Sequence, residues 1–129
     1  ERVHALTDVT GFGLAGHLLE ICRGSKLSAT VRFADIPLIG EARDWAEEGV
    51  ATGASDRNWA SYGGDVHLAA GAPAWHGKMV TDPQTSGGLL VACAPEAVED
   101  VLAEFRREGF AEARVIGSLG AGPATVTFV

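Results

Sequence analysis

Residues 7–13, Thr-Asp-Val-Thr-Gly-Phe-Gly, place a carboxylate and two glycines directly ahead of a helical pattern. A helix N-terminus with unhindered N–H groups attracts phosphate oxygens, and Mg²⁺ takes one or two carboxylates together with phosphates and waters. Asp8 is therefore a candidate metal ligand, and the candidate nucleotide-binding residues are Thr10, Gly11 and Gly13. In the alternative, Asp8 and Thr10 only cap the following helix, and the glycines only permit close packing.

A second polar segment, residues 82–88 (Asp-Pro-Gln-Thr-Ser-Gly-Gly), precedes an apolar run over residues 89–93. Such a run is typical of an interior strand with both faces covered, and ligands gather at the ends of such strands. The alternative is an ordinary Asp-Pro turn followed by a glycine bulge. The segment is not a Walker loop, because no Gly-Lys-Ser/Thr follows, and its role stays open between these two interpretations.

The remaining polar candidates give weaker signals. Arg57 and Asn58 lie in an aromatic-flanked stretch, where the arginine fork is suited to an anion or a neighbouring domain; an ordinary surface arginine is the simpler interpretation. None of the histidines has a metal-ligand spacing, so structural roles are expected for them. They are His4, His17, His67 and His76. Cys22 and Cys93 lie in apolar patterns, which predict buried thiols with raised pKa values and no nucleophilic role.

Composition excludes several classes of partner. The 129 residues include ten Lys and Arg against seventeen Asp and Glu, for a formal net charge of −7, which argues against nucleic-acid binding. The same charge disfavours an anionic membrane surface, and the longest apolar run, residues 87–94, is far shorter than a bilayer span. Two widely separated cysteines and the absence of a signal peptide predict reduced thiols in a cytoplasmic protein.

Periodicity and turn residues predict a mixed α+β domain. In chain order, the predicted elements are an extended stretch over residues 3–9, a helix over 14–24, a strand over 27–36, a short helix over 41–48, a short strand at 79–80, a strand over 89–93, a helix over 95–108, and strands over 113–119 and 124–129. Thr10 is expected to cap the first helix and Gly24 to end it, and its apolar residues predict burial on several sides. Residues 50–78 are predicted to be functional or partly helical, because a loop of that length is uncommon in a compact domain. The last two strands are expected to be adjacent and antiparallel, and the acidic face of helix 95–108 to be solvated.

Three segments, taken in this order, resemble the C-terminal domain of the selenophosphate synthetase (selenide, water dikinase) family. They are residues 7–18, Arg57-Asn58 and residues 82–90. The resemblance covers nearly the whole chain and extends to Val115-Ile116-Gly117, although Ser118 stands where an acidic residue is common in the family. It implies the aminoimidazole ribonucleotide synthetase-like superfamily, whose C-terminal domain is an α+β sandwich, a mixed and mainly antiparallel sheet packed with helices.

The resemblance also implies an activity and a role for the first motif. Enzymes of this family use ATP, selenide and water to make selenophosphate, with release of AMP and phosphate. Asp8 matches the aspartate that the C-terminal domain contributes to the Mg²⁺–ATP site, which favours the metal-ligand interpretation over the helix cap. Thr10, Gly11 and Gly13 match the same motif and are expected to shape that site.

Under this resemblance, residues 1–129 are one domain, the C-terminal domain of a longer two-domain enzyme that forms a homodimer. The chain begins with Glu1 and not with Met, which favours this interpretation. The N-terminal domain, with most of the ATP contacts, is expected outside this chain, together with the catalytic Cys or selenocysteine and its companion Lys. The chain by itself is therefore expected to be inactive.

Two alternatives remain. A related ATP-dependent synthetase or kinase of the same superfamily, such as a thiamine-phosphate kinase or a hydrogenase-maturation protein, would use the same two-domain plan, although residues 82–88 argue against it. The second alternative is a non-catalytic interaction domain. A Gly-rich upstream segment with a Cys or selenocysteine and a Lys is required by the selenophosphate synthetase interpretation and by neither alternative.

Overall fold

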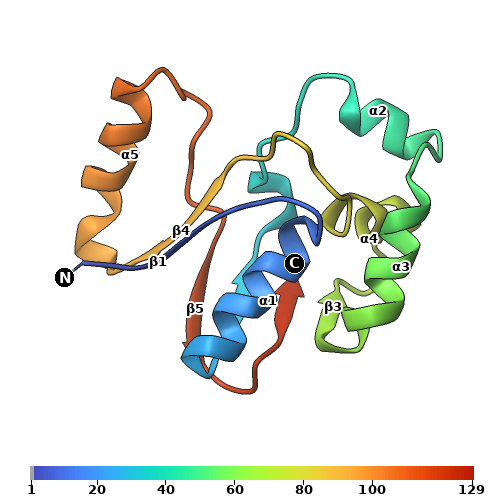
Figure 1. Cartoon of the computed structure of the whole chain (residues 1–129), viewed down its shortest axis with the longest axis horizontal. Coiled ribbons are helices and arrows are strands. Elements are labelled where there is room, and N and C mark those ends of the chain that lie inside the picture. Colours follow the sequence, from blue (N-terminus) through green and yellow to red (C-terminus); the bar gives the residue numbers. More distant parts are fainter. Residues whose placement is uncertain (1) are drawn as a thin grey trace.

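The computed structural model describes residues 2–129, which form α-helices and two β-sheets (Figure 1). The strands are β1 (Val3–Asp8), β2 (Leu27–Val31), β3 (Val66–Leu68), β4 (Leu89–Cys93), β5 (Gly117–Ala121) and β6 (Val126–Phe128). The α-helices are α1 (Gly13–Ser25), α2 (Ala42–Glu47), α3 (Gly53–Tyr62), α4 (Ala74–Val80) and α5 (Val98–Arg107). Three short 3₁₀ turns occupy Phe33–Asp35, Gly63–Asp65 and Pro95–Ala97. The predicted α+β class is confirmed.

Four strands form the larger sheet, in the order β3, β6, β2, β5. Strand β2 is antiparallel to β5 and parallel to β6, and β3 is parallel to β6, so the sheet is mixed. The prediction that the last two strands are neighbours is wrong, because β2 lies between them. Ala29 of β2 is opposite Leu119 of β5 on one side and Val126 of β6 on the other. The turn residues between β5 and β6 predicted a hairpin of these two strands, but β2, which is distant in the sequence, pairs with both of them.

Helix α1 packs on one face of this sheet and forms the core with it. The buried apolar residues of α1 are Leu14, Ala15, Leu18, Leu19 and Cys22. The strands contribute Ala29, Val31, Val66, Val126 and Phe128. Thr30 and Ser118, on the opposite face of the sheet, are exposed, so buried apolar and exposed polar residues alternate along β2 and the strand predicted from periodicity at this place is confirmed. Burial of α1 on several sides is likewise confirmed, and removal of this apolar surface from water stabilises the packing.

Strands β1 and β4 form a separate antiparallel pair, with Asp8 opposite Leu89. Within residues 2–129, β4 has no second neighbouring strand, and the side chains of Leu6 and Leu89 are 59% and 54% exposed. The prediction of an interior strand with both faces covered is therefore wrong, since an apolar run does not by itself reveal how many neighbours a strand has. The pairing nevertheless brings the end of β1 to the start of β4, and with them the two polar segments of the sequence.

The ends of helix α1 differ from the prediction. The helix begins at Gly13 without a hydrogen bond from a capping side chain, so Thr10 is not its cap. It continues past Gly24 to Ser25 and ends where Lys26 adopts a left-handed conformation with φ of 55°. The backbone N–H of Lys26 donates to the carbonyl of Cys22, which closes the last turn in the absence of a glycine at this position.

Other boundaries differ as well. Strand β2 ends at Val31, before a 3₁₀ turn that the alternating pattern did not reveal. Residues 79–80, predicted as a strand, form the last turn of α4. Residues 113–116 are not part of a strand, because β5 begins only at Gly117. The segment 50–78 contains α3, β3 and most of α4, so the prediction that it is partly helical is confirmed.

Helix α5 lies at one end of the molecule and α3 at the other (Figure 1). The acidic face of α5 is solvated as predicted, with exposed ion pairs such as Glu99 to Arg106 and Arg2 to Asp100. Exposed pairs of this kind contribute little to stability. Among the described residues, no helix combines the length and the apolar character needed to cross a bilayer.

Candidate functional site

The loop that connects β1 to α1 lies against the loop that connects α4 to β4. We refer to residues 9–13 as the glycine loop and to residues 81–88 as the polar loop. The backbone N–H of Val9 donates to the carbonyl of Gly88 (2.9 Å), and the N–H of Gln84 donates to the carbonyl of Thr10 (3.1 Å). The structure thus brings together two segments that are about 70 residues apart in the sequence and were identified independently from it.

The two loops approach so closely that glycine is required at two positions. A Cβ atom on Gly87 would lie 1.8 Å from the carbonyl oxygen of Val9, and one on Gly13 would lie 2.7 Å from the carbonyl carbon of Thr81. Gly13 also has a φ of +70°, in the region that favours glycine. Glycines of both sequence motifs therefore have a packing role at the junction, in addition to any contact with a ligand.

Helix α3 contributes side chains to the same junction. The side-chain amide of Asn58 donates to the carbonyl of Gly11 (2.9 Å) and to the carbonyl of Thr81 (3.0 Å). The hydroxyl of Tyr62, one helical turn further on, donates to the carbonyl of Phe12. Of the predicted Arg57-Asn58 motif, only the asparagine reaches the two loops, whereas Arg57 is exposed.

The carbonyl groups of the glycine loop point into the junction. The carbonyls of Thr10, Gly11 and Phe12 accept hydrogen bonds from the polar loop or from α3. In a trans peptide the N–H points away from the preceding C=O, so the N–H groups of Gly11 and Phe12 point away from the junction. No oxygen within residues 2–129 accepts a hydrogen bond from either group. Adjacent free N–H groups next to a helix N-terminus are suited to an anion such as a phosphate group.

Asp8 is the last residue of β1, immediately before the glycine loop, and its side chain is exposed. The described residues hold no cluster of three or more His, Cys, Asp or Glu side chains that would bind a metal ion by itself. A single exposed carboxylate beside free N–H groups nevertheless fits Mg²⁺, which takes one or two protein carboxylates and completes its shell with phosphates and waters. Such an ion would need ligands from outside this chain.

The hydroxyl of Thr10 lies 3.1 Å from Nε2 of His17. It is thereby turned toward the buried side of α1, because His17 is only 7% exposed. Glu20 approaches Nδ1 of the same ring at 3.4 Å without hydrogen-bond geometry. Thr10 therefore shapes the glycine loop through His17, and its carbonyl, not its hydroxyl, contacts the polar loop.

The other histidines and both cysteines lie outside this junction. His76 stacks on Phe33 with ring centroids 3.7 Å apart, and the pKa of its ring is lowered by burial. His4 and His67 are exposed. Cys22 is buried in the core, where burial raises the pKa of its thiol as predicted, and Cys93 is partly buried in β4.

Two ionisable groups at the junction are shifted by burial. Burial raises the pKa of the Asp82 carboxyl, at the start of the polar loop, above its ordinary value. Burial also raises the pKa of Tyr62 to about 12, because the phenolate would lose its hydration. Tyr62 is buried and Asp82 is partly buried, so water is partly excluded where α3 meets the loops.

The chain contains a single tyrosine, so its phenolate absorbance reports on Tyr62 alone. We expect a titration midpoint near 12 in the native chain against 10 in the denaturant-unfolded chain. Because the folded pKa is raised, the stability contributed by neutral Tyr62 is complete below pH 10 and is lost as the pH rises through 12. Tyr62→Phe is expected to remove this part of the alkaline loss of stability. A native midpoint equal to that of the unfolded chain would contradict the buried position of Tyr62.

Comparison with known proteins places the chain in a family. The model of the family described as "AIR synthase related protein, C-terminal domain" matches residues 1–129. The chain belongs to this family. The match confirms the superfamily and the fold that the sequence motifs implied. Asp8, the glycine loop and the polar loop are therefore features of an AIR synthase related C-terminal domain.

Curated relatives of this AIR synthase related domain carry the name "Selenide, water dikinase". A protein of Burkholderia orbicola is 60% identical over 124 residues, which are 96% of this chain and 35% of the relative. A protein of Paraburkholderia xenovorans is 57% identical over 129 residues, which are 100% of this chain and 36% of the relative. A protein of Rhizobium meliloti is 51% identical over 127 residues, which are 98% of this chain and 36% of the relative. The predicted resemblance to this family is confirmed. The chain spans about a third of the length of these relatives.

Sequence reasoning missed Tyr62 and Thr81. Tyr62 follows Asn58 by four residues, a spacing that places both on one face of a helix and would have linked them had α3 been predicted. Helix α3 escaped prediction because it is polar and has little amphipathic pattern. Thr81 precedes the polar motif and is fully buried, and no signal in the sequence marks its carbonyl as a hydrogen-bond acceptor.

Proposed function

We propose that this domain is the C-terminal part of an ATP-dependent selenophosphate synthetase, which converts ATP, selenide and water to selenophosphate, AMP and phosphate. The observation that carries the proposal is the junction itself, where the glycine loop, Asn58 and the polar loop meet directly after Asp8. These are the three segments on which the family resemblance rests. Relatives named "Selenide, water dikinase" that are 51–60% identical to the chain support it.

In this proposal the domain binds and orients the phosphates of ATP. The carboxylate of Asp8 would hold Mg²⁺, and the N–H groups of Gly11 and Phe12 would donate to phosphate oxygens. Thr10 and Gly13 would shape the loop without touching the nucleotide. Bound Mg²⁺ supplies neutralisation of the charge that spreads over the phosphate oxygens during transfer. The chain's own residues would align the phosphates of ATP, because transfer of a phosphoryl group depends mostly on alignment and charge neutralisation.

One carboxylate and two N–H groups do not make a complete phosphoryl-transfer site. We propose that residues 1–129 are a single domain and that an N-terminal domain supplies most of the ATP contacts, the Cys or selenocysteine nucleophile and a Lys. The exposed position of Asp8 supports a site shared with another domain. We further propose that the full-length enzyme is a homodimer of the cytoplasm. The two free cysteines, Cys22 and Cys93, are consistent with a reducing compartment.

The test compares the full-length protein that contains this domain with the 129-residue chain alone. We expect the full-length protein to release AMP from ATP only when selenide and Mg²⁺ are both present, and the chain alone to show no turnover. The measurement is AMP and phosphate by chromatography, with and without selenide. Nucleotide turnover by the full-length protein that is indifferent to selenide would assign it to a related synthetase or kinase. Turnover by the chain alone that Asp8→Asn removes would contradict the proposed division between domains.

A further inference from the structure

We infer that Asn58 is a positioning residue whose side-chain amide clamps the glycine loop to the polar loop, and so fixes the direction of the free N–H groups that follow Asp8. What these groups act on rests on the proposed function, whereas the clamp itself rests on geometry. Asn58 does not reach the reacting atoms, and it acts through the backbone of Gly11.

The amide of Asn58 is used completely as a donor. Its nitrogen lies 2.9 Å from the carbonyl oxygen of Gly11 and 3.0 Å from that of Thr81. A side-chain amide carries two N–H bonds, so each carbonyl can receive one of them. Within the described part of the chain, no other side chain hydrogen-bonds to both loops.

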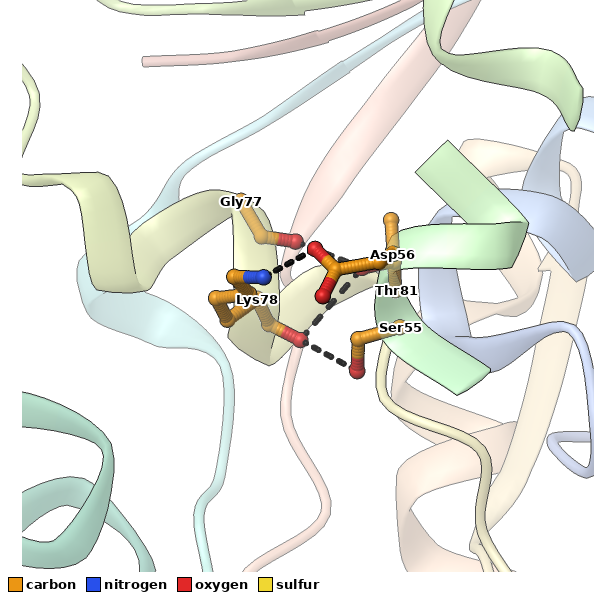
Figure 2. A network of polar contacts seen from close by, with 5 residues as sticks. All are labelled: Ser55, Asp56, Gly77, Lys78 and Thr81. Carbon is orange, nitrogen blue, oxygen red and sulfur yellow. Dashed lines mark hydrogen bonds and ion pairs between the residues drawn. The ribbon is translucent and has the colours of Figure 1, made fainter. Parts of the chain in front are cut away.

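Helix α3 holds the amide in place because it is itself attached to the end of α4 (Figure 2). Lys78 forms an ion pair with Asp56, and its carbonyl accepts a hydrogen bond from the hydroxyl of Ser55 (3.4 Å). The hydroxyl of Thr81 donates to the carbonyl of Gly77 (2.8 Å). Ser55 and Thr81 are fully buried, so neither hydroxyl exchanges these partners for water. The backbone of α3 at Asn58, one turn after Ser55, is therefore held in place relative to α4.

The glycine loop needs such a clamp at Gly11. A Cβ atom at this position would meet nothing within 4 Å, so packing does not restrain the residue, and glycine is free to adopt many backbone conformations. Rotation of the peptide between Gly11 and Phe12 would turn the N–H of Phe12 into the junction and away from a bound phosphate. The hydrogen bond from Asn58 to the carbonyl of Gly11 holds this peptide in the orientation that leaves the N–H outward.

Loss of the clamp is expected to lower the rate and not only the amount of folded protein. A misplacement of about 1 Å at a catalytic site costs up to about 100-fold in rate. In the full-length enzyme, Asn58→Ala is expected to lower kcat for selenide-dependent AMP formation about 10- to 100-fold and to raise the Mg²⁺ concentration that gives half the maximal rate. Ser61→Ala, an exposed position on the same helix, is the matched control and is expected to change neither.

A double-mutant cycle separates positioning from general destabilisation. Because Asn58 acts on the loop that follows Asp8, the double variant with Asp8→Asn is expected to be about as slow as Asp8→Asn alone. The inference would be overturned if the rate of the double variant fell by the product of the two single losses, while the Mg²⁺ dependence of Asn58→Ala stayed unchanged and its rate followed its folded fraction. Asn58→Ser retains one hydrogen-bond donor and is expected to change kcat and the half-saturating Mg²⁺ concentration by a smaller factor. This variant replaces Asn58→Ala if Asn58→Ala does not fold.

Amide hydrogen exchange tests the clamp independently of the reaction. We expect the hydrogen-bonded amides of the glycine loop, those of Val9 and Gly13, to exchange at least about tenfold faster in Asn58→Ala than in the wild type, with the exchange of β2 and β6 unchanged. Equal exchange in the glycine loop would overturn the inference. If the wild-type enzyme forms no selenide-dependent AMP, the proposed function is wrong, and the exchange rates still decide whether Asn58 holds the loops together.

Discussion

In the proposed full-length selenophosphate synthetase, Asp8→Asn is expected to lower kcat/KM for selenide-dependent AMP formation about 100-fold or more, equivalent to about 2.7 kcal/mol of transition-state stabilisation. An amide has nearly the shape of a carboxylate but lacks the negative charge that makes a carboxylate the usual protein ligand of Mg²⁺. Because Asp8 is exposed at the end of β1, the substitution is expected to leave the free energy of unfolding within about 0.5 kcal/mol of the wild type.

The measurement is the initial rate of AMP release across a Mg²⁺ titration. The wild-type rate is expected to saturate with Mg²⁺, whereas the Asp8→Asn rate should need far more Mg²⁺ or never recover. Asp44→Asn, which removes the charge of another exposed aspartate in α2, is the matched control and is expected to behave as the wild type. Equal rates for Asp8→Asn and Asp44→Asn would show that Asp8 is not a metal ligand.

Gly87→Ala is expected to lower the free energy of unfolding by about 3 kcal/mol or more, because the new methyl group has no space. Its position would lie 1.8 Å from the carbonyl oxygen of Val9, and that carbonyl belongs to backbone that cannot move without opening the junction. Gly88→Ala is the matched control, because nothing lies within 4 Å of the corresponding position and its φ is not in the left-handed region. A compatible Gly-to-Ala change stabilises slightly by restricting the unfolded chain, so the control is expected to gain up to about 1 kcal/mol.

Urea unfolding followed by tryptophan fluorescence measures both variants, since the chain contains three tryptophans. The expected result is a large loss of stability for Gly87→Ala and a small gain for Gly88→Ala, although the two substitutions are chemically identical and adjacent. Equal stabilities for the two variants would show that the glycine loop and the polar loop do not approach as closely as the structure indicates. In the full-length enzyme, the folded fraction of Gly87→Ala is expected to lose activity as well, because the same contact orients the loop after Asp8.

The sequence by itself determined the features that depend on local pattern. Alternation of Ala29 and Val31 with polar residues identified the core face of β2, and the apolar residues of α1 identified a helix buried on several sides. Asp8, the glycine loop and the polar loop were identified as candidates because short motifs carry a recognisable chemistry. These properties are local, since the direction in which a side chain points follows from the period of its own helix or strand.

The tertiary structure alone decided which of these pieces meet. Strand β2 separates β5 from β6, and Asn58 reaches Gly11 across 47 residues of sequence. Neither follows from periodicity, because strand order and side-chain hydrogen bonds depend on which surfaces pack together, and that choice minimises the energy of the whole chain. The same reason explains why helix α3 was not predicted: its polar residues carry little pattern of their own, and their role arises from the two loops they hold.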